Sequence, residues 1–242
     1  MPEPRASVLI AAAGTGRRFA EAAGGGGALS KVFADLAGRP VLAYVLEAFW
    51  RVEAVAEVVV AVPETSVEWA RGRFGETGPA GRPLCWVAGG ADRTESVARA
   101  LAASDPALPL VAVHDGARPL IRSAVIAEAL RVAAAEGAAV VGRPVDHTVK
   151  RVGAEGRVLE TVPRGRLWLA QTPQVFRREV IEEAYRRRGE AAGSVTDDAQ
   201  LVEALGRPVR MVRGEAANIK ITTPEDLRLC EALLVAGWSP EG

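Results

Sequence analysis

The chain has 242 residues, of which 49% are hydrophobic, and this is enough to bury the core of one large domain. Its 30 Lys and Arg balance its 30 Asp and Glu, so we expect no general attraction to nucleic acid or to an acidic membrane surface. The two cysteines form no C-x-x-C pattern, no apolar run is long enough to span a bilayer, and no signal peptide is evident, which together predict a cytoplasmic protein.

The first predicted strand begins at Ser7 and ends in a loop of small residues that is followed by two arginines. The loop has the sequence Ala12-Ala13-Gly14-Thr15-Gly16-Arg17-Arg18. Its glycines allow a close approach of the backbone to a ligand, and backbone N–H groups beside guanidinium groups suit a triphosphate. Phe19 stands where a dinucleotide fingerprint needs its third glycine, and the Gly-Lys-Ser/Thr of a P-loop is missing. A plain strand-to-helix turn is the remaining alternative.

Residues 21–30 contain four consecutive glycines and no core-forming pattern, so they form either a lid over bound phosphates or a surface insertion. Lys31 follows, and together with Lys150 and Lys220 it is one of three lysines among 30 cationic residues. A lysine supplies a compact, movable charge, whereas an arginine supplies a planar fork. We therefore expect chemistry at these three positions; coding bias with chance is the alternative.

Strands and helices then alternate along the chain. Apolar runs predict strands at residues 58–62, 84–87, 110–113 and 138–141. Periodic apolar positions predict helices at residues 41–50, 64–74, 97–103 and 123–136. The alternation predicts an α/β fold with a doubly wound, mostly parallel sheet, whose ligand crevice lies at the carboxyl ends of the strands.

Two loops at that edge carry polar residues. The Gly89-Gly90 pair before helix 97–103 suits close backbone contact with the edge of a base, although a simple turn before a capped helix is the plainer alternative. The strand at 110–113 leads into His114 and Asp115, and the carboxylate is well placed to hold a divalent cation against phosphates. His114 has no evident partner and is predicted to be structural.

The alternation stops at residue 146. Two short β-like segments, at 148–152 and 158–162, flank a glycine-containing turn, and a hairpin that buries so little is marginal by itself in water. We expect residues 146–167 to form a β-arm that packs on a second copy of the chain in a homodimer. No domain linker is evident, so residues 1–242 are predicted to form one domain with this arm.

The rest of the chain is predicted to return to the sheet. Strands are expected at residues 168–172, 209–212 and 218–221, and helices at 177–188 and 199–205. Thr223 as N-cap and Pro224 at the first helical position predict the start of a final helix.

Seven motifs occur in one order over nearly the whole chain. They are the loop at residues 11–18, Gly89-Gly90 with Arg93 and Ser96, residues 114–119, Pro144-Val145 with Thr148-Val149-Lys150, Leu167-Trp168 with residues 171–174, residues 195–199, and residues 218–222 with 224–226. Together they resemble the 2-C-methyl-D-erythritol 4-phosphate cytidylyltransferase family of the non-mevalonate isoprenoid pathway. The resemblance implies a Rossmann-like nucleotidyltransferase sheet and a reaction of CTP with methylerythritol phosphate that gives 4-diphosphocytidyl-2-C-methyl-D-erythritol and pyrophosphate, with Mg²⁺.

The resemblance also implies roles for individual residues. The catalytic set would be Arg18, Lys31, Arg164 and Lys220: Arg18 and Lys31 would stabilise the transition state, and Lys220 and Arg164 would position the methylerythritol phosphate. The nucleotide would be bound by Ala12, Ala13, Gly14, Thr15, Gly16, Gly90, Asp92, Ser96 and Ala117. The polyol phosphate would be bound by Asp115, Arg118, Thr148, Lys150, Thr172 and Thr196. Asp115 would also lie near the metal, and Thr148 and Arg164 would act from the partner subunit through the arm.

The chemistry agrees with this set of residues. The nucleophile is already an anionic phosphate oxygen, so no general base is needed, and the difficulty lies in bringing two anions together. Positioned cations and a metal ion relieve that repulsion and stabilise the charge on the α-phosphate and the leaving pyrophosphate. A chain with two histidines and no Ser-His-Asp pattern can therefore be an enzyme.

Four positions in three motifs depart from the family pattern. Ser30 and Val32 flank the catalytic lysine where the family usually has Pro and often Gln. His147 precedes the arm threonine where Asp is common, and Ala91 follows the Gly-Gly pair where an acid is common. The last change leaves Asp92 or the backbone to contact the base.

Three other functions remain open from the sequence. A cytidylyltransferase acting on ribitol 5-phosphate would share the fold, and residues of the arm would separate it from the methylerythritol enzyme. A sugar-1-phosphate nucleotidyltransferase using UTP or dTTP is a more distant alternative. A non-catalytic nucleotide-binding regulator belongs to a different class, and the cations predicted on both sides of the α-phosphate argue against it.

Overall fold

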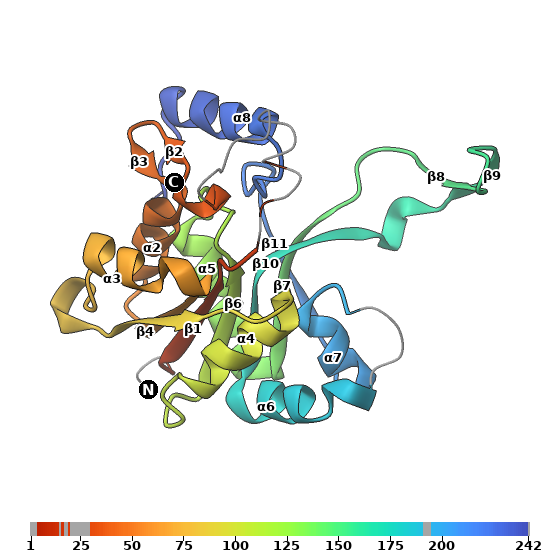
Figure 1. Cartoon of the computed structure of the whole chain (residues 1–242). Coiled ribbons are helices and arrows are strands. Elements are labelled where there is room, and N and C mark those ends of the chain that lie inside the picture. The colour runs from red at the N-terminus through yellow and green to blue at the C-terminus, as the bar shows by residue number, and fades with distance from the viewer. Residues whose placement is uncertain (1–3, 15, 17–18, 20–29, 191–194, 242) are drawn as a thin grey trace.

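A computed structural model describes residues 4–14, 16, 19, 30–190 and 195–241 of the chain. Its centre is a seven-stranded sheet in the order β11-β7-β10-β6-β1-β4-β5 (Figure 1). The strands are β1 (Ala6–Ala11), β4 (Val55–Val62), β5 (Leu84–Ala88), β6 (Leu110–Asp115), β7 (Ala138–Pro144), β10 (Trp168–Arg177) and β11 (Arg210–Arg213). Of these seven, β10 runs antiparallel to both its neighbours, and the other pairs are parallel. The predicted mostly parallel sheet is confirmed.

Helices cover both faces of this sheet, as a doubly wound fold requires (Figure 1). One face carries α2 (Val41–Trp50), α3 (Val67–Phe74) and α5 (Ser123–Glu136), and the other carries α4 (Arg93–Ala102), α6 (Arg178–Arg186) and α7 (Asp198–Ala204). The side chains of β1 alternate between the two cores: Val8 and Ile10 pack in the first and Leu9 in the second. Strands buried on both faces explain the uninterrupted apolar runs of the sequence.

The predicted helices differ from the observed ones mainly at their starts. The helices predicted at 41–50 and 123–136 are confirmed as α2 and α5. Helix α4 begins four residues earlier than predicted, because the Asp92 side chain caps it by accepting a 2.7 Å hydrogen bond from the Glu95 N–H. The segment predicted as one helix at 64–74 is a 3-10 turn, η2 (Glu64–Ser66), followed by α3.

The C-terminal third contains two corrections. Strand β10 does not end at Pro173 but continues to Arg177, with a shift of register against β7 between Ala170 and Gln174. Residues 218–221, predicted as a strand, are not one; Asn218 is buried there and its side-chain amide donates a 2.9 Å hydrogen bond to the Thr172 carbonyl. The Asn218 side chain and single backbone bonds, such as that from the Ile221 N–H to the Ala117 carbonyl at 2.8 Å, thus take the place of the expected strand pairing.

The final helix, α8 (Pro224–Val235), begins as predicted. Thr223 and Asp226 form a capping box in which each side chain accepts from the backbone N–H of the other. Cys230 is the helix residue that is fully buried, against the core on the α2 and α5 side. None of the helices described here has the length and apolar character that crossing a membrane requires.

Several short elements join these parts. They are η1 (Lys31–Phe33), β2 (Asp35–Leu36), β3 (Arg39–Pro40), η3 (Pro79–Gly81), η4 (Arg164–Arg166) and η5 (Arg188–Glu190). The strands β8 (Val149–Val152) and β9 (Val158–Val162) pair antiparallel as a two-stranded arm that projects away from the main sheet (Figure 1). In the arm, Val152, Val158 and Leu159 are each more than half exposed.

Candidate active site

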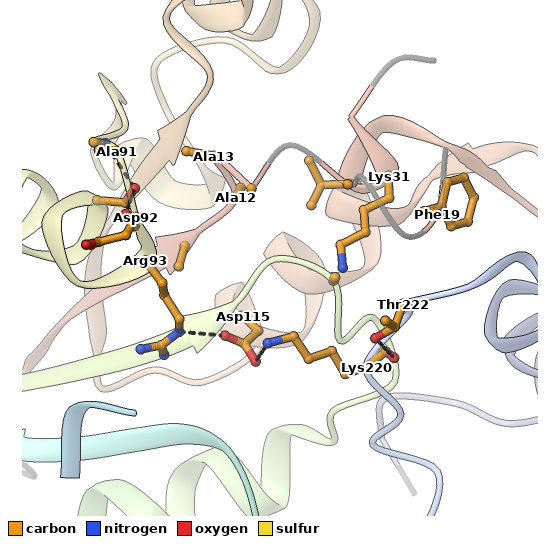
Figure 2. A pocket seen from close by; sticks show the side chains of 17 residues that line it. Ala12, Ala13, Phe19, Lys31, Ala91, Asp92, Arg93, Asp115, Lys220 and Thr222 are labelled. Atoms are coloured by element: carbon orange, nitrogen blue, oxygen red, sulfur yellow. Dashed lines mark hydrogen bonds and ion pairs between the residues drawn. The ribbon is translucent and has the colours of Figure 1, made fainter. Parts of the chain in front are cut away.

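A cavity of about 530 Å³ opens at the carboxyl ends of β1 and β6. This volume lies within the range of small-molecule sites. Its walls come from the loop after β1, from η1, from the β5–α4 loop, from the end of β6 and from the segment before α8 (Figure 2). The lining residues are Ala11, Ala12, Ala13, Gly14, Gly16, Phe19, Lys31, Val32, Gly90, Ala91, Asp92, Arg93, Ser96, Asp115, Ala117, Lys220 and Thr222.

The loop between β5 and α4 packs tightly against the loop after β1. A Cβ atom on Gly89 would lie 2.1 Å from the Cβ of Ala13, so glycine is required for this approach. The buried Ser96 hydroxyl donates to the Asp92 carbonyl at 2.7 Å and accepts from the Gly90 N–H at 3.0 Å. This wall of the cavity is therefore held by its own polar groups, and Ser96 shapes it as well as lining it.

The loop also explains how the chain accommodates Ala91, which stands where the family commonly has an acid. The Ala91 N–H donates a 3.0 Å hydrogen bond to the Glu95 carboxylate, while Asp92 is occupied in capping α4. Neighbouring side chains thus satisfy the backbone that follows the Gly-Gly pair. Asp92 still lines the cavity, as its predicted contact with the nucleotide requires.

Asp115 is the centre of charge in the cavity. Its carboxylate lies 3.0 Å from Arg93 Nε, 2.9 Å from Lys220 Nζ and 3.3 Å from Arg118 Nε. Figure 2 shows Arg93 and Lys220 reaching it from opposite sides. Burial raises the pKa of the Asp115 carboxyl, but these three cations outweigh burial and hold that pKa well below its usual range. Asp115 is therefore anionic at any physiological pH.

Two lysines from distant parts of the chain face the same cavity. Lys31 begins η1, and Lys220 comes from the irregular segment before α8 (Figure 2). Gly16 lies against Lys31 with a φ of +61°, a left-handed conformation that favours glycine. Two of the three lysines singled out in the sequence are thus brought together at one site.

His114 and Thr172 lie behind Asp115 rather than in the cavity lining. His114 is fully buried, with Nε2 3.2 Å from the Arg118 carbonyl and Nδ1 3.0 Å from Thr172 Oγ1. A carbonyl can only accept, so Nε2 carries the proton and Thr172 donates to Nδ1. Burial lowers the pKa of His114 to about 3, and the ring is neutral. Thr172 Oγ1 also accepts from the Asp115 N–H at 3.1 Å, which fixes the end of β6.

Other residues predicted to bind the polyol phosphate lie elsewhere. Arg118 is mostly buried beside Asp115, and its Nη1 donates 2.9 Å to the Asn218 carbonyl. Thr196 precedes α7 and donates 3.0 Å to the Gln200 side chain. Both lie outside the residues that line the cavity.

The arm residues are separate from the cavity of their own chain (Figure 1). Lys150 Nζ donates 2.6 Å to Thr161 Oγ1, and Arg164 donates to the Asp146 carbonyl. Thr148 lies just before β8. Two predicted site residues, Thr15 and Arg18, and the glycine run at 24–27 lie outside the described residues.

Arg93 and Asp198 belong to two of the sequence motifs, but the sequence predicts no role for either of them. In the structure Arg93 contacts Asp115 through Nε and Asp198 through Nη1 at 2.8 Å. The signal available in the sequence was that both belong to polar motifs at predicted strand and helix ends. Their contact joins segments about a hundred residues apart, so spacing alone does not predict it.

Comparison with known proteins decides which family this site belongs to. The model of the family described as 2-C-methyl-D-erythritol 4-phosphate cytidylyltransferase matches residues 6–236. The chain belongs to this family. A curated cytidylyltransferase of that name from Pelotomaculum thermopropionicum is 42% identical over 232 residues, which cover 96% of this chain and 95% of the relative. One from Symbiobacterium thermophilum is 43% identical over 228 residues, covering 94% of this chain and 92% of the relative.

Solved structures of cytidylyltransferases agree. The crystal structure of 2-C-methyl-D-erythritol 4-phosphate cytidylyltransferase from Thermus thermophilus is 41% identical, with a TM-score of 0.74, and covers 95% of this chain and 98% of that one. The structure of 4-diphosphocytidyl-2C-methyl-D-erythritol synthase from Anaerococcus prevotii has a TM-score of 0.81 at 28% identity, covering 96% and 99%. The predicted resemblance and the Rossmann-like nucleotidyltransferase fold are confirmed.

Proposed function

We propose that this chain transfers a cytidylyl group from CTP to 2-C-methyl-D-erythritol 4-phosphate, giving 4-diphosphocytidyl-2-C-methyl-D-erythritol and pyrophosphate. The observation that carries the proposal is the cavity at the ends of β1 and β6, where Lys220 and Arg93 contact the buried Asp115 carboxylate and Lys31 lines the same cavity. Membership of the cytidylyltransferase family supports CTP and the methylerythritol phosphate over ribitol 5-phosphate, over other nucleotides and over a non-catalytic role.

The proposed reaction is a single displacement at phosphorus. A phosphate oxygen of the polyol phosphate forms a bond to the α-phosphorus of CTP, and the bond from that phosphorus to the oxygen of the leaving pyrophosphate breaks. The nucleophile is already anionic, and the neutral, buried His114 takes no proton from it. Catalysis then depends on cations that hold the two anions in line and stabilise the charge of the pyrophosphate. Lys31 and Lys220, which both line the cavity, would supply these cations.

Mg²⁺ is proposed as the metal that accompanies CTP. Among the residues described here, no group of three or more His, Cys, Asp and Glu is arranged to hold a metal ion. Magnesium is commonly bound through one or two carboxylates together with the phosphates of a substrate. Asp115, although it already contacts Arg93, Arg118 and Lys220, is the buried anionic carboxylate that such a site would use. When bound, the ion would offset the charge of the triphosphate, with Asp115 as its protein ligand.

The homodimer is also proposed, with the arm as its contact. The arm exposes Val158 and Leu159 to 60% and 65%, and side chains of this kind are normally covered. In a dimer, Thr148 and Arg164 would reach the cavity of the partner subunit, which their own chain's geometry does not allow. A location in the cytoplasm remains a prediction from the sequence.

The dimer is tested with one substitution on the arm. Leu159→Asp should give a monomer by sedimentation and remove most turnover, because the site would lose the partner's arm residues. Arg157→Ala changes an exposed charge at the same tip and should leave both properties as in the wild type. A wild-type monomer at micromolar concentration, or a monomeric variant with full turnover, would contradict this role of the arm.

The reaction is tested by pyrophosphate release with Mg²⁺, crossing CTP, UTP and ATP against methylerythritol phosphate and ribitol 5-phosphate. Release with CTP and methylerythritol phosphate alone is expected. Release with ribitol 5-phosphate instead would keep the fold and the chemistry but change the substrate. No release in any combination would favour a nucleotide-binding regulator.

A further inference from the structure

The Arg93 guanidinium contacts Asp115 in the cavity and also a buried carboxylate outside the cavity, that of Asp198. Arg93 is the first residue of α4, and its Nε lies 3.0 Å from Asp115 Oδ1. Its Nη1 lies 2.8 Å from Asp198 Oδ2. Asp198 is the first residue of α7 and is 1% exposed, and it is not among the residues that line the cavity. One side chain thus connects the charge centre of the site to a second helix layer.

Asp198 is itself fixed by a buried tyrosine. The Tyr185 hydroxyl on α6 donates a short hydrogen bond to Asp198 Oδ1, so both carboxylate oxygens have a partner. Burial raises the pKa of Tyr185, and the neighbouring Asp198 carboxylate raises it further, which keeps the hydroxyl protonated as a donor. The neutral Tyr185 hydroxyl therefore donates to the Asp198 carboxylate, and this carboxylate in turn holds Arg93. We call Tyr185 and Asp198 together the anchor.

The start of α7 is tied to the sheet as well. Asp197 caps the helix by accepting 3.1 Å from the Gln200 N–H, and its other oxygen accepts 2.8 Å from the Gln174 amide on β10. The side-chain oxygen of Gln174, Oε1, accepts from the Ala199 N–H at 2.9 Å. These bonds fix Asp198 relative to the sheet whose strand β6 carries Asp115.

The charges explain what the anchor does. Burial lowers the pKa of Arg93, but the carboxylates of Asp198 and Asp115 raise it by more, so the guanidinium is charged. Without Asp198, Arg93 would be a partly exposed cation at the wall of a site for a triphosphate, free to turn toward the phosphates. When Asp198 holds Arg93, the guanidinium of Arg93 contacts Asp115 Oδ1, and Oδ2 is contacted by Lys220 and Arg118.

We propose that Arg93 is a positioning residue anchored by Asp198 and Tyr185, and that it sets the orientation of Asp115 and, through Asp115, the place of Lys220. The proposal rests on the proposed function in that Lys220 would receive the polyol phosphate. The anchor then acts on the second substrate and on turnover, while the loops that would hold CTP keep their own hydrogen bonds.

The test is a set of conservative variants assayed against both substrates. Asp198→Asn keeps the shape and removes the charge, and Tyr185→Phe removes only the donor to Asp198. In Asp198→Asn we expect the KM for methylerythritol phosphate to rise about 10-fold with a fall in kcat, as for a small misplacement of a substrate-binding group. The KM for CTP should stay near the wild-type value. Tyr185→Phe should change the same parameters less.

A matched control lies on the same helix. Glu203→Gln removes an exposed carboxylate of α7 that makes no hydrogen bond or ion pair with Arg93, Asp198 or Tyr185, all of which the structure describes, and it should leave both KM values unchanged. Thermal melting of each variant checks the fold, and if Asp198→Asn does not fold, Tyr185→Phe decides the matter. Equal rises in both KM values, or no change in either for the folded variants, would overturn the proposal.

A second readout does not depend on turnover. The chain has three lysines, so reductive ¹³C-methylation gives one resolvable NMR signal for each, and Lys220→Arg assigns that of Lys220. In Asp198→Asn the Lys220 signal should shift toward that of the exposed Lys150, while the Lys150 signal stays in place. An unmoved Lys220 signal would overturn the proposal. A wild-type enzyme without cytidylyl transfer would overturn the proposed function instead and leave this measurement valid.

Discussion

Lys220 places a movable cation against Asp115, with Nζ 2.9 Å from Oδ2, from a segment without regular secondary structure. Lys220→Ala leaves Asp115 with its two arginine partners but removes the charge that faces the cavity. If Lys220 acts like a donor that stabilises charge in the transition state, turnover should fall on the order of 10²–10³-fold. Steady-state pyrophosphate release measures this.

Arg228→Ala is the control for that substitution. Arg228 lies on α8, close in sequence to Lys220, and pairs at the surface with Glu225. Exposed pairs of this kind contribute little, so turnover and melting temperature should remain near the wild-type values. A loss in Lys220→Ala no larger than that in Arg228→Ala would contradict the role of Lys220.

At the scale of elements, the close approach of two loops forms one wall of the cavity. Gly89→Ala would place a Cβ 2.1 Å from the Ala13 Cβ and 3.0 Å from Ser96 Oγ, which forces the loop after β1 and the start of α4 apart. We expect a loss of stability of about 1–3 kcal/mol, as for overpacking, and weaker binding of CTP. Urea unfolding and calorimetric titration with CTP measure the two effects.

The matched glycine is Gly72, which is exposed in α3 and has open space where a Cβ would stand. Gly72→Ala should stabilise the protein by about 0.5–1 kcal/mol through helix propensity and leave CTP binding unchanged. Destabilisation of the same size in both variants would mean that the loop contact at Gly89 is not specific.

The sequence predicts elements best where one local signal dominates. Helices α2 and α5 match their predicted bounds because each has a clear apolar face, and α8 has a complete capping box. The start of α4 differs from the prediction because the polar residues after the Gly-Gly pair indicate a turn up to residue 96, whereas in the structure the Asp92 side chain caps a helix that begins at Arg93. Strand β10 continues past Pro173 because its pairing with β6 and β7 outweighs the local signal of the proline.

The candidate site was predictable where residues follow strands and not where contacts cross the fold. Lys31, Asp115 and Lys220 were singled out from composition and strand ends together with the resemblance, and the cavity brings them together. The bonds from Arg93 to Asp198 and from Thr172 to His114 join segments that only the folded sheet brings into contact. Neither pair has a spacing that sequence reasoning could use.

At the scale of the whole molecule, burial of His114 in the core makes the free energy of unfolding depend on pH. Its ring is fully buried, with its nitrogens bonded to Thr172 and to the Arg118 carbonyl, and it meets Phe49 edge-on with centroids 5.0 Å apart. The pKa of His114 is lowered from 6.5 to about 3, mainly by burial. Below pH 6.5 the unfolded chain therefore binds a proton that the folded chain does not bind, and stability falls as the pH falls.

Between pH 7 and pH 5 this single group should cost about 2 kcal/mol of the free energy of unfolding. The Asp115 carboxyl has a lowered pKa, so its own contribution is present above the unfolded pKa of about 4 and is lost mainly below this window. His114→Asn removes the titrating ring, and the difference in unfolding free energy between the two pH values should shrink by about that amount. Urea unfolding at both pH values, for wild type and variant, measures it. Equal pH dependence in the two proteins would mean that His114 has the same pKa in the folded and the unfolded chain, so that the folded ring is protonated at pH 5. A protonated Nδ1 could not accept from Thr172, and the hydrogen bonds behind Asp115 would have to be arranged differently.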